Sequence, residues 1–384
     1  MLMLMQLTTI TITLTNLFDA VGSIIRIAEI DSTSGNVLVN SGQIAGNSGT
    51  IEVVAGQGGI VTGAGTIQLN ATIGVTVNDV LTTANGTITI DADVDNNAVG
   101  SLISGADGDV TSGGANVTVI AADVSLSGDI DAGAGTLFLQ PSTAASIGLG
   151  GAAGSFNLTD AEADLITAAV LEIGLPTSLA ISVGDLSLAP GKVATLLLQT
   201  DATVNQTPVD ANITDIAVTN LAIDADDGVV IDIDATTLAV INSESGFAQI
   251  TDTAGGLTIG TVATTSLGNV SGVASGGSGV QITANNGLLT VNESVIDAGN
   301  STILGTQGAA DIAINAVVQS TSLTGRIELN SGRDLIINDG GANDISVVGT
   351  GFINFASEGT TQLNANVDAV TAGGAITFDV EDLV

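Results

Sequence analysis

The sequence predicts an all-β protein built as a parallel β-helix, in which successive turns of a coil lay strand upon strand. The first observation is a phrase that recurs along the 384 residues: a run alternating small polar and branched apolar residues, then a cluster of Gly, Asn, Asp, Ser and Ala. Copies of this phrase occupy residues 66–69, 87–90, 116–120, 280–283 and 327–329. A chain that repeats in this way stacks units rather than folding around one centre.

Composition is the second observation. Hydrophobic residues make up 45% of the chain but aromatic residues only 2%, with seven Phe and neither Trp nor Tyr. The interior must therefore be filled by Val, Ile, Leu and Ala, which suits a narrow space between pleated strands. Fifty Gly supply bends that need a positive φ angle, and only four Pro interrupt the backbone N–H groups that sheets require.

An antiparallel sandwich or barrel also fits short, regularly spaced strands. The β-helix is favoured because the pattern continues along the whole chain, whereas a sandwich closes after about seven to nine strands. Small irregular connectors and the scarcity of aromatic residues favour it as well. With about 20 residues to a coil, the chain would form roughly 18 coils.

Strand candidates lie roughly every 8 to 16 residues, and turn signals such as Asn85-Gly86 and Asn286-Gly287 separate them. The clear candidates are residues 23–27, 36–39, 50–54, 66–69, 73–77, 87–90, 116–120, 136–139, 179–183, 194–198, 229–233, 237–241, 256–259, 280–283, 288–291, 310–314, 327–329, 335–337, 345–347, 352–355 and 375–380.

One segment breaks this rhythm and predicts a short helix near 159–167. Thr159 has the residue type of a helix cap, and Glu162 follows it at the spacing of a capping box. Asp160 and Glu162 fall in the first turn, where negative charge favours the helix dipole. Strand character returns at residues 170–173, so we expect an excursion from one coil rather than a domain boundary.

We expect one β-solenoid array over residues 1–384, with loop insertions at 150–170 and at 199–222, which contains Pro208. The apolar N-terminus has no basic residue before Arg26, which is not the pattern of a signal peptide. The last residues, 375–380, still belong to a repeat. These features predict a fragment of a longer exported chain, or a sequence whose start is misplaced.

The charged and reactive residues exclude several function classes. The chain has no Cys and no His, so disulfides, thiolate metal sites, Cys nucleophiles and imidazole bases are excluded. Four Lys and Arg face forty Asp and Glu, giving a formal charge of −36. Such a chain repels nucleic acids and anionic membranes but attracts divalent cations. No apolar run reaches about 18 residues, so we expect no direct membrane insertion.

Two acidic clusters are candidate calcium sites, because carboxylates at this spacing can ligate calcium. The EF-hand pattern is not matched, since its sixth position after Asp91 is Asn96 and its twelfth is Leu102. The alternative is that these residues satisfy backbone groups at coil corners. The six candidates are Asp91, Asp93, Asp95, Asp224, Asp226 and Asp227.

A catalytic role is weighed against a structural one. Some parallel β-helix enzymes cleave acidic polysaccharides with an Arg or Lys base beside calcium-binding Asp. Arg326 and Arg333, near Asp334, are the only basic pair, and we expect them to pair with surface carboxylates instead. An acidic polysaccharide would also meet a repulsive field. The sequence therefore predicts no enzyme, no catalytic residue and no cofactor other than calcium.

Residues 325–337 and 113–119 resemble the repeats of filamentous-haemagglutinin-like and autotransporter-adhesin-like exoproteins, and residues 147–166 with 171–174 are similar to an element of the same large β-strand-repeat proteins. The resemblance implies a right-handed parallel β-helix that is secreted or attached to the bacterial surface or outer membrane. It also implies adhesion, with host or neighbouring-cell glycans or proteins and a secretion transporter as partners. It transfers no binding residue.

Overall fold

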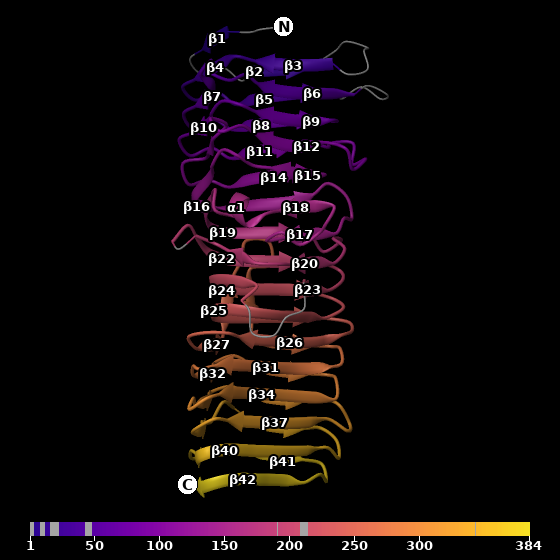
Figure 1. Ribbon diagram of the computed structural model, residues 1–384, viewed down its shortest axis with the longest axis vertical. Coiled ribbons are helices and arrows are strands. Elements are labelled where there is room, and N and C mark those ends of the chain that lie inside the picture. Colours follow the sequence, from indigo (N-terminus) through magenta and orange to yellow (C-terminus); the bar gives the residue numbers. More distant parts are fainter. Residues whose placement is uncertain are drawn as a thin grey trace. The chain divides into compact units, whose positions relative to one another are not determined.

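The computed structural model describes residues 4–7, 12–15, 23–42, 48–189, 191–207, 214–341 and 343–384. Strands account for 57% of the chain and helix for 1%, so the all-β prediction is confirmed. The chain divides into an N-terminal unit, Met1–Leu179 with Leu186–Ala194, and a C-terminal unit, Ala180–Asp185 with Thr195–Val384. In each unit parallel strands stack from coil to coil (Figure 1), which is the predicted β-helix; its right-handed sense stays a prediction.

In the N-terminal unit the strands form three parallel rows. One row runs through β1, β4, β7, β10, β13 and the first halves of β16 and β19. A second runs through β2, β5, β8, β11, β14 and the second halves of β16 and β19. The third holds β3, β6, β9, β12 and β15. Each coil thus gives one strand to each of three faces.

The strands of this unit are β1 (Leu4–Leu7), β2 (Ile12–Thr15), β3 (Ser23–Ile27), β4 (Glu29–Ser32), β5 (Val37–Ser41), β6 (Gly49–Val53), β7 (Gly59–Thr62), β8 (Ile67–Ala71), β9 (Gly74–Val77), β10 (Leu81–Thr83), β11 (Ile88–Asp91), β12 (Ser101–Ser104), β13 (Val110–Thr111), β14 (Val117–Ala121), β15 (Asp123–Ser125), β16 (Ile130–Pro141), β17 (Ile147–Leu149), β18 (Phe156–Leu158), β19 (Ile166–Gly174) and β21 (Leu186–Ser187).

The interior is a stack of aliphatic side chains, as the composition predicts. Because side chains alternate along a strand, every second residue points inward and meets its register partner on the next coil. One such column is fully buried on six coils: Val39, Leu69, Ile90, Val119, Leu139 and Ile173. Burying each of these side chains is worth roughly 1.5–3 kcal/mol.

The predicted helix is present as α1 (Asp160–Ala163), shorter than the expected 159–167. Thr159 caps it, and both hydrogen bonds of the capping box with Glu162 are formed. The helix ends early because Ile166 already begins β19. The region 150–170, expected as a loop insertion, also contains β18, whose Phe156 and Leu158 are fully buried. Strand β18 pairs with β17 and contacts β15, so this segment fills the interior.

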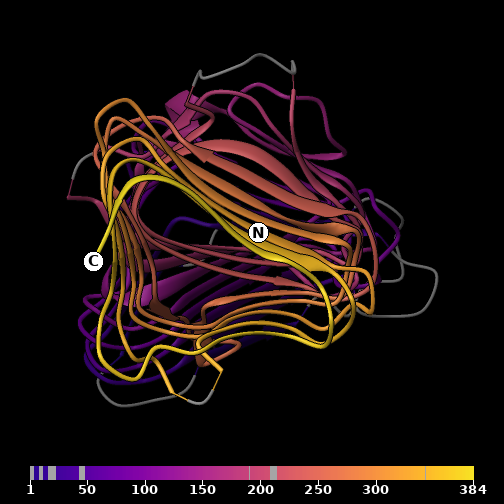
Figure 2. The ribbon, with the colours of Figure 1, turned by 90° about the horizontal axis from the view of Figure 1, so that it is seen from below.

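The C-terminal unit by itself also has three rows of parallel strands around a closed interior, as the yellow and orange coils show in Figure 2. The first row contains β23, β25, β26, β31, β34, β37, β40 and β42. The second row contains β22, β24, β25, β27, β32, β35, β38 and β40. The third row contains β25, β30, β33, β36, β39 and β41, and long strands such as β25 take part in more than one row. The ring of the buried Phe355 stacks on its register partner Phe378, which is 40% exposed, with centroids 4.9 Å apart.

The strands of this unit are β20 (Ile181–Val183), β22 (Val193–Gln199, from Thr195 on), β23 (Val204–Gln206), β24 (Ile216–Ala225), β25 (Val229–Asn242), β26 (Phe247–Asp252), β27 (Leu257–Ile259), β28 (Thr261–Ala263), β29 (Asn269–Ser271), β30 (Val273–Ser275), β31 (Gly279–Asn285), β32 (Leu289–Val291), β33 (Val295–Asp297), β34 (Ser301–Gln307), β35 (Ile312–Ile314), β36 (Val318–Ser320), β37 (Arg326–Ser331), β38 (Leu335–Ile337), β39 (Ile345–Val347), β40 (Phe352–Leu363), β41 (Ala369–Thr371) and β42 (Ile376–Leu383).

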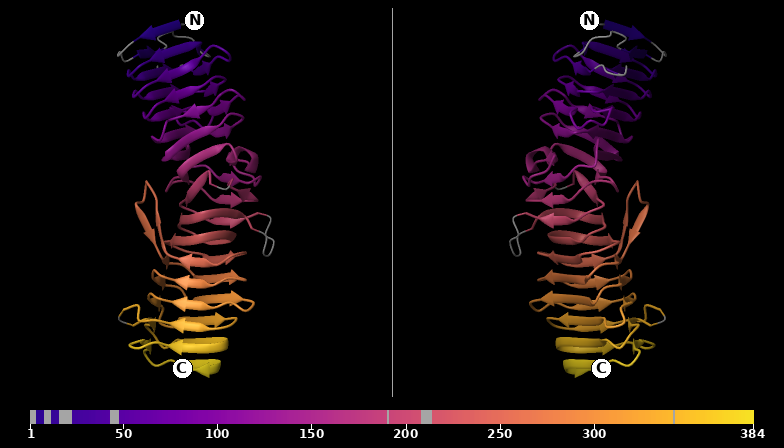
Figure 3. Two further views of the ribbon diagram at one scale, coloured as in Figure 1. Left: turned by 90° about the vertical axis from the view of Figure 1, so that its left-hand side faces the viewer. Right: turned by 90° about the vertical axis from the view of Figure 1, so that its right-hand side faces the viewer.

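One hairpin departs from the parallel pattern. Strands β28 and β29 pair antiparallel and stand out from the C-terminal unit (Figure 3, left, orange). Val262 and Val270 on the hairpin's inner face pack on a small outer cluster that includes Leu197, Ala222 and Ala239. Part of the second expected loop insertion, 199–222, forms β23 and β24, while residues 208–213 with Pro208 lie outside the described residues.

Coil length varies more than the expected 20 residues. Side chains stacked on neighbouring coils are 20 residues apart at Asn116 and Thr136 but 30 apart at Asn40 and Asn70. Most of the additional residues lie at the corners, since most strand pairs keep an unshifted register. The pairs β16 with β19 and β40 with β42 are exceptions and contain register shifts. Corners of unequal length are therefore where the surface of each unit becomes uneven.

An asparagine ladder joins four coils of the C-terminal unit. The Asn315 amide donates to the side-chain oxygen of Asn292 at 2.8 Å, Asn338 donates to Asn315 at 2.6 Å, and Asn364 donates to Asn338. We expect Asn338→Ala to lower the free energy of unfolding by about 1–2 kcal/mol, because it breaks two of these bonds. Urea unfolding followed by circular dichroism measures the change, with Asn330→Ala on β37 as the control outside the ladder. If Asn338→Ala and Asn330→Ala lower the free energy of unfolding equally, the hydrogen bonds of the ladder make no specific contribution to stability.

Candidate functional site

The first acidic cluster lies at the corner between β11 and β12. Asp93 is fully buried, and its carboxylate accepts hydrogen bonds from the backbone N–H groups of Asn97, at 3.3 Å, and Ala98, at 2.8 Å. Asp91 accepts from the N–H of Asp93, and Asp95 accepts from the Asn97 amide. The pKa of Asp91 is raised mainly by burial and to a smaller extent by the neighbouring carboxylates. The pKa of Asp95 is also raised mainly by burial, and its contact with Asp93 raises it further.

The second cluster lies at the end of β24 in the C-terminal unit, with Asp224 in the strand and Asp226 and Asp227 directly after it. Asp224 accepts a hydrogen bond from the Gln199 amide at 2.8 Å. Asp227 accepts from the Ser245 hydroxyl at 2.6 Å, and Asp226 accepts from the hydroxyl of Ser243. Each of these bonds joins one coil to a neighbouring coil of the same unit, so the carboxylates have a connecting role at this corner.

The structure thus does not gather the six calcium candidates into a metal-binding arrangement. Within the described residues, no group of three or more acidic side chains is placed to hold a metal ion. The bonds at both corners match the alternative interpretation, in which Asp and Asn satisfy backbone and hydroxyl groups. Calcium binding itself stays a prediction.

All four basic side chains are held by oxygen atoms. Arg26 pairs with Glu52, and Arg326 pairs with Glu328. Arg333 pairs with Asp311 and Asp334, which confirms the predicted pairing of Arg326 and Arg333 with surface carboxylates. The Arg333 guanidinium lowers the pKa of Asp311. Lys192 donates to the backbone oxygen of Asp164 at 2.5 Å.

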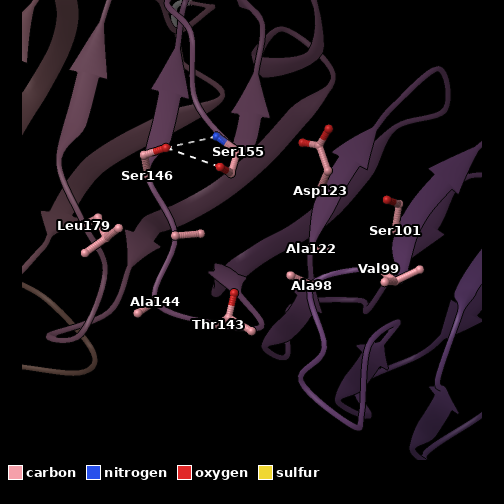
Figure 4. Close-up of a pocket in the computed structure, with 11 residues that line it drawn as sticks. Ala98, Val99, Ser101, Ala122, Asp123, Thr143, Ala144, Ser146, Ser155 and Leu179 are labelled. Atoms are coloured by element: carbon pink, nitrogen blue, oxygen red, sulfur yellow. Dashed lines mark hydrogen bonds between the residues drawn. The ribbon is translucent and has the colours of Figure 1, made fainter.

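A hollow of about 400 Å³ opens in the N-terminal unit beside the first acidic cluster (Figure 4). It arises because three successive corners differ in length. Residues 92–100 connect β11 to β12 and residues 142–146 connect β16 to β17, whereas Ala122 alone connects β14 to β15. The short corner leaves a gap between two longer ones. The lining is Ala98, Val99, Ser101, Ala122, Asp123, Thr143, Ala144, Ala145, Ser146, Ser155 and Leu179.

Asp93 joins the two walls of this hollow. Its carboxylate holds the 92–100 corner through Asn97 and Ala98 and also accepts from the hydroxyl of Ser142, at 2.5 Å and 49 residues away. Ala98 takes a φ of +64°, a left-handed conformation that costs a non-glycine residue roughly 1 kcal/mol or more. The bond from the Ala98 N–H to Asp93 offsets that strain. The wall is therefore held in a defined conformation.

The lining is polar on one side and aliphatic on the other. Asp123 on β15 accepts a hydrogen bond from the Asn157 N–H at 2.7 Å through one carboxylate oxygen. The Ser146 hydroxyl accepts from the Ser155 N–H at 3.1 Å and lies 3.4 Å from the Ser155 hydroxyl (Figure 4). Val99 and Leu179 are 59% and 48% exposed and supply the aliphatic side of the lining.

The structure places Asp93, one of the six calcium candidates, beside this hollow through its bonds to Ala98 and Ser142, and none of the six candidates lines the hollow. The hollow depends on corners from three coils, and no local pattern marks such an arrangement. The local signal that was available is Asp93 followed by Asn96 and Asn97, which is typical of a hydrogen-bonded turn.

Comparison with known protein families, with curated proteins and with solved structures gives no match. Among the described residues, helix α1 has four residues, and no helix is long and apolar enough to cross a membrane. The site must therefore be interpreted from its own chemistry.

We expect Asp93→Ala to lower the free energy of unfolding of the N-terminal unit by about 2 kcal/mol, because two N–H groups and the Ser142 hydroxyl lose their acceptor. Thermal melts measure the change, and we expect it to be the same in calcium and in chelator. Asp107→Ala is the matched control, with a change of about 0.5 kcal/mol or less at an exposed position of the same unit. A melting temperature of the unsubstituted chain that falls in chelator would instead favour calcium sites.

Proposed function

We propose that this chain is a non-catalytic structural and adhesive segment of a large secreted or cell-surface bacterial protein, of the filamentous-haemagglutinin-like kind. The observation that carries the proposal is the stacking of parallel coils on an aliphatic interior. Such a stack is a scaffold whose faces and corners can present contact residues over a long surface.

The ion pairs of the basic residues support a non-catalytic role. An elimination reaction on an acidic polysaccharide needs a base that can reach the substrate, and Arg326 and Arg333 are each engaged with carboxylates. The acidic chain would also repel such a substrate. The acidic surface favours partners that are neutral or basic.

Two assays test the proposal together. The purified chain is incubated with neutral and acidic polysaccharides, and new reducing ends and unsaturated products are measured; we expect none above the buffer control. The chain is also immobilised on beads and exposed to bacterial and animal cells, and we expect retention above beads carrying an unrelated acidic protein. Turnover that a single Asp substitution abolishes would overturn the proposal, as would the absence of retention.

A further inference from the structure

We propose that the hollow at the corner of Ala122 binds the side chain of a lysine on a basic partner protein. This inference deepens the proposed function and rests on it only in supposing that the surface meets a partner. Asp93 fixes the walls of the hollow, and the lining combines one carboxylate, several hydroxyl groups and exposed aliphatic side chains.

Charge decides the class of ligand. The carboxylate of Asp123 is the one ionisable group in the lining, and no basic residue accompanies it. The four basic residues of the chain are engaged with other oxygens, and the chain carries a formal charge of −36. An anion would be repelled, and a neutral sugar would gain nothing from the charge. A cation is attracted over a distance by the negative charge of the chain and can form an ion pair with Asp123 once it enters the hollow.

The number of carboxylates excludes a divalent metal as the occupant. Calcium takes six to eight oxygen ligands, usually with several carboxylates among them. Asp123 is alone, and one of its oxygens already accepts from the Asn157 N–H at 2.7 Å. An organic cation needs one carboxylate contact and can use hydroxyl oxygens for the rest.

Lysine fits this lining better than arginine. A guanidinium pairs best with both oxygens of a carboxylate, and one oxygen of Asp123 is occupied. An ammonium is a point charge with three donors, which can be shared between Asp123 and hydroxyl oxygens such as those of Ser101 and Thr143. Its four-carbon stem covers apolar surface, and Val99 and Leu179 offer such surface at the rim.

The test titrates the full chain with N-acetyl-lysine N-methylamide and follows the backbone amide resonances of Val99, Ala122 and Thr143 by NMR. We expect these resonances to shift with a dissociation constant in the millimolar range, and the uncharged norleucine analogue to bind about tenfold more weakly. Equal binding of the norleucine analogue would overturn the proposal. Shifts with methyl glucoside in the absence of shifts with the lysine compound would overturn it in favour of a sugar site.

Three variants separate the hollow from general attraction to an acidic protein. Asp123→Asn keeps an oxygen for the Asn157 N–H and should weaken binding about tenfold. Ala122→Leu keeps every charge, puts a larger side chain into the lining at the short corner and should weaken the binding that the shifts report. Asp107→Asn makes the same charge change at an exposed position and should leave the dissociation constant within about twofold. If Asp107→Asn weakens binding as much as Asp123→Asn, the proposal fails. That result would contradict the lysine site but not the proposed function. Polysaccharide turnover would contradict the proposed function but not the lysine site.

Discussion

Replacing Phe156 by Ala is expected to lower the free energy of unfolding of the N-terminal unit by about 3–5 kcal/mol. Phe156 is fully buried on β18, a strand that pairs with β17 and contacts β15. Removing its ring leaves a cavity in an interior where coils above and below are already in register, so the surroundings can collapse only in part. Urea unfolding followed by circular dichroism measures the loss.

Phe138→Ala is the matched control, because it makes the same chemical change in the same unit. Phe138 points outward on β16 and is only half-buried, so we expect a loss of about 1 kcal/mol. Hydrogen exchange gives a local measurement, and peptides covering 147–174 should lose protection in Phe156→Ala alone. If the two substitutions cost the same, residues 150–170 behave as the loop insertion that the sequence suggested, and the buried position of β18 is wrong.

The fold could be predicted because its determinants are local. The alternation at residues 87–90 specifies β11 (Ile88–Asp91), in which Ile88 and Ile90 point inward and are fully buried. The Thr159 and Glu162 pair likewise specifies the capping box of α1. Both patterns act within a few residues, so the chain carries the information without reference to its neighbours.

What the sequence did not reveal depends on contacts between coils. Strand β15 (Asp123–Ser125) is only three residues long, which is too short for its alternation to stand out, and it lies beside its parallel partner β12. The antiparallel hairpin of β28 and β29 is set by packing on Leu197 and its neighbours, which are distant in sequence. Propensity is a weak guide for such segments, since tertiary contacts override it.

The candidate site was only partly visible in the sequence for the same reason. Asp93 stands out as an acidic residue, but its burial and its bond to Ser142, 49 residues away, follow from the stacking of three coils. The hollow requires that the corner at Ala122 be shorter than the corners on both sides. Corner lengths can be counted only once the strands and their registers are known.

The second large effect concerns Asp252, at the end of β26 in the C-terminal unit. Its side chain is fully buried between register partners Ile233 and Ala284. One carboxylate oxygen accepts from the Ala235 N–H at 3.4 Å, and the other has no hydrogen-bond partner among the described residues. Burial, with a smaller contribution from the charge of Asp234, raises the pKa of Asp252 from 3.8 to about 7.

A raised carboxyl pKa makes the folded state hold its proton more tightly than the unfolded state does. The contribution of Asp252 to stability is therefore complete below pH 4, falls as the pH rises, and is lost above about pH 7. At about 1.4 kcal/mol per pH unit, the total loss is of the order of 4 kcal/mol. We expect Asp252→Asn, which keeps the shape but cannot ionise, to be more stable than the unsubstituted chain by several kcal/mol at pH 8 and nearly equal to it at pH 4.

Urea unfolding at pH 4, 6 and 8 tests this prediction, with Asp201→Asn as the control at an exposed position of the same unit. Asp201→Asn should change the free energy of unfolding by about 0.5 kcal/mol or less at each pH, because an exposed carboxylate keeps its hydration when the chain folds. The difference between Asp252→Asn and the unsubstituted chain must grow with pH, since only ionisation inside the stack creates it. A difference that is constant across the three pH values would show that Asp252 is solvated in the folded state, and a stability loss at pH 8 would show that its charge has a partner.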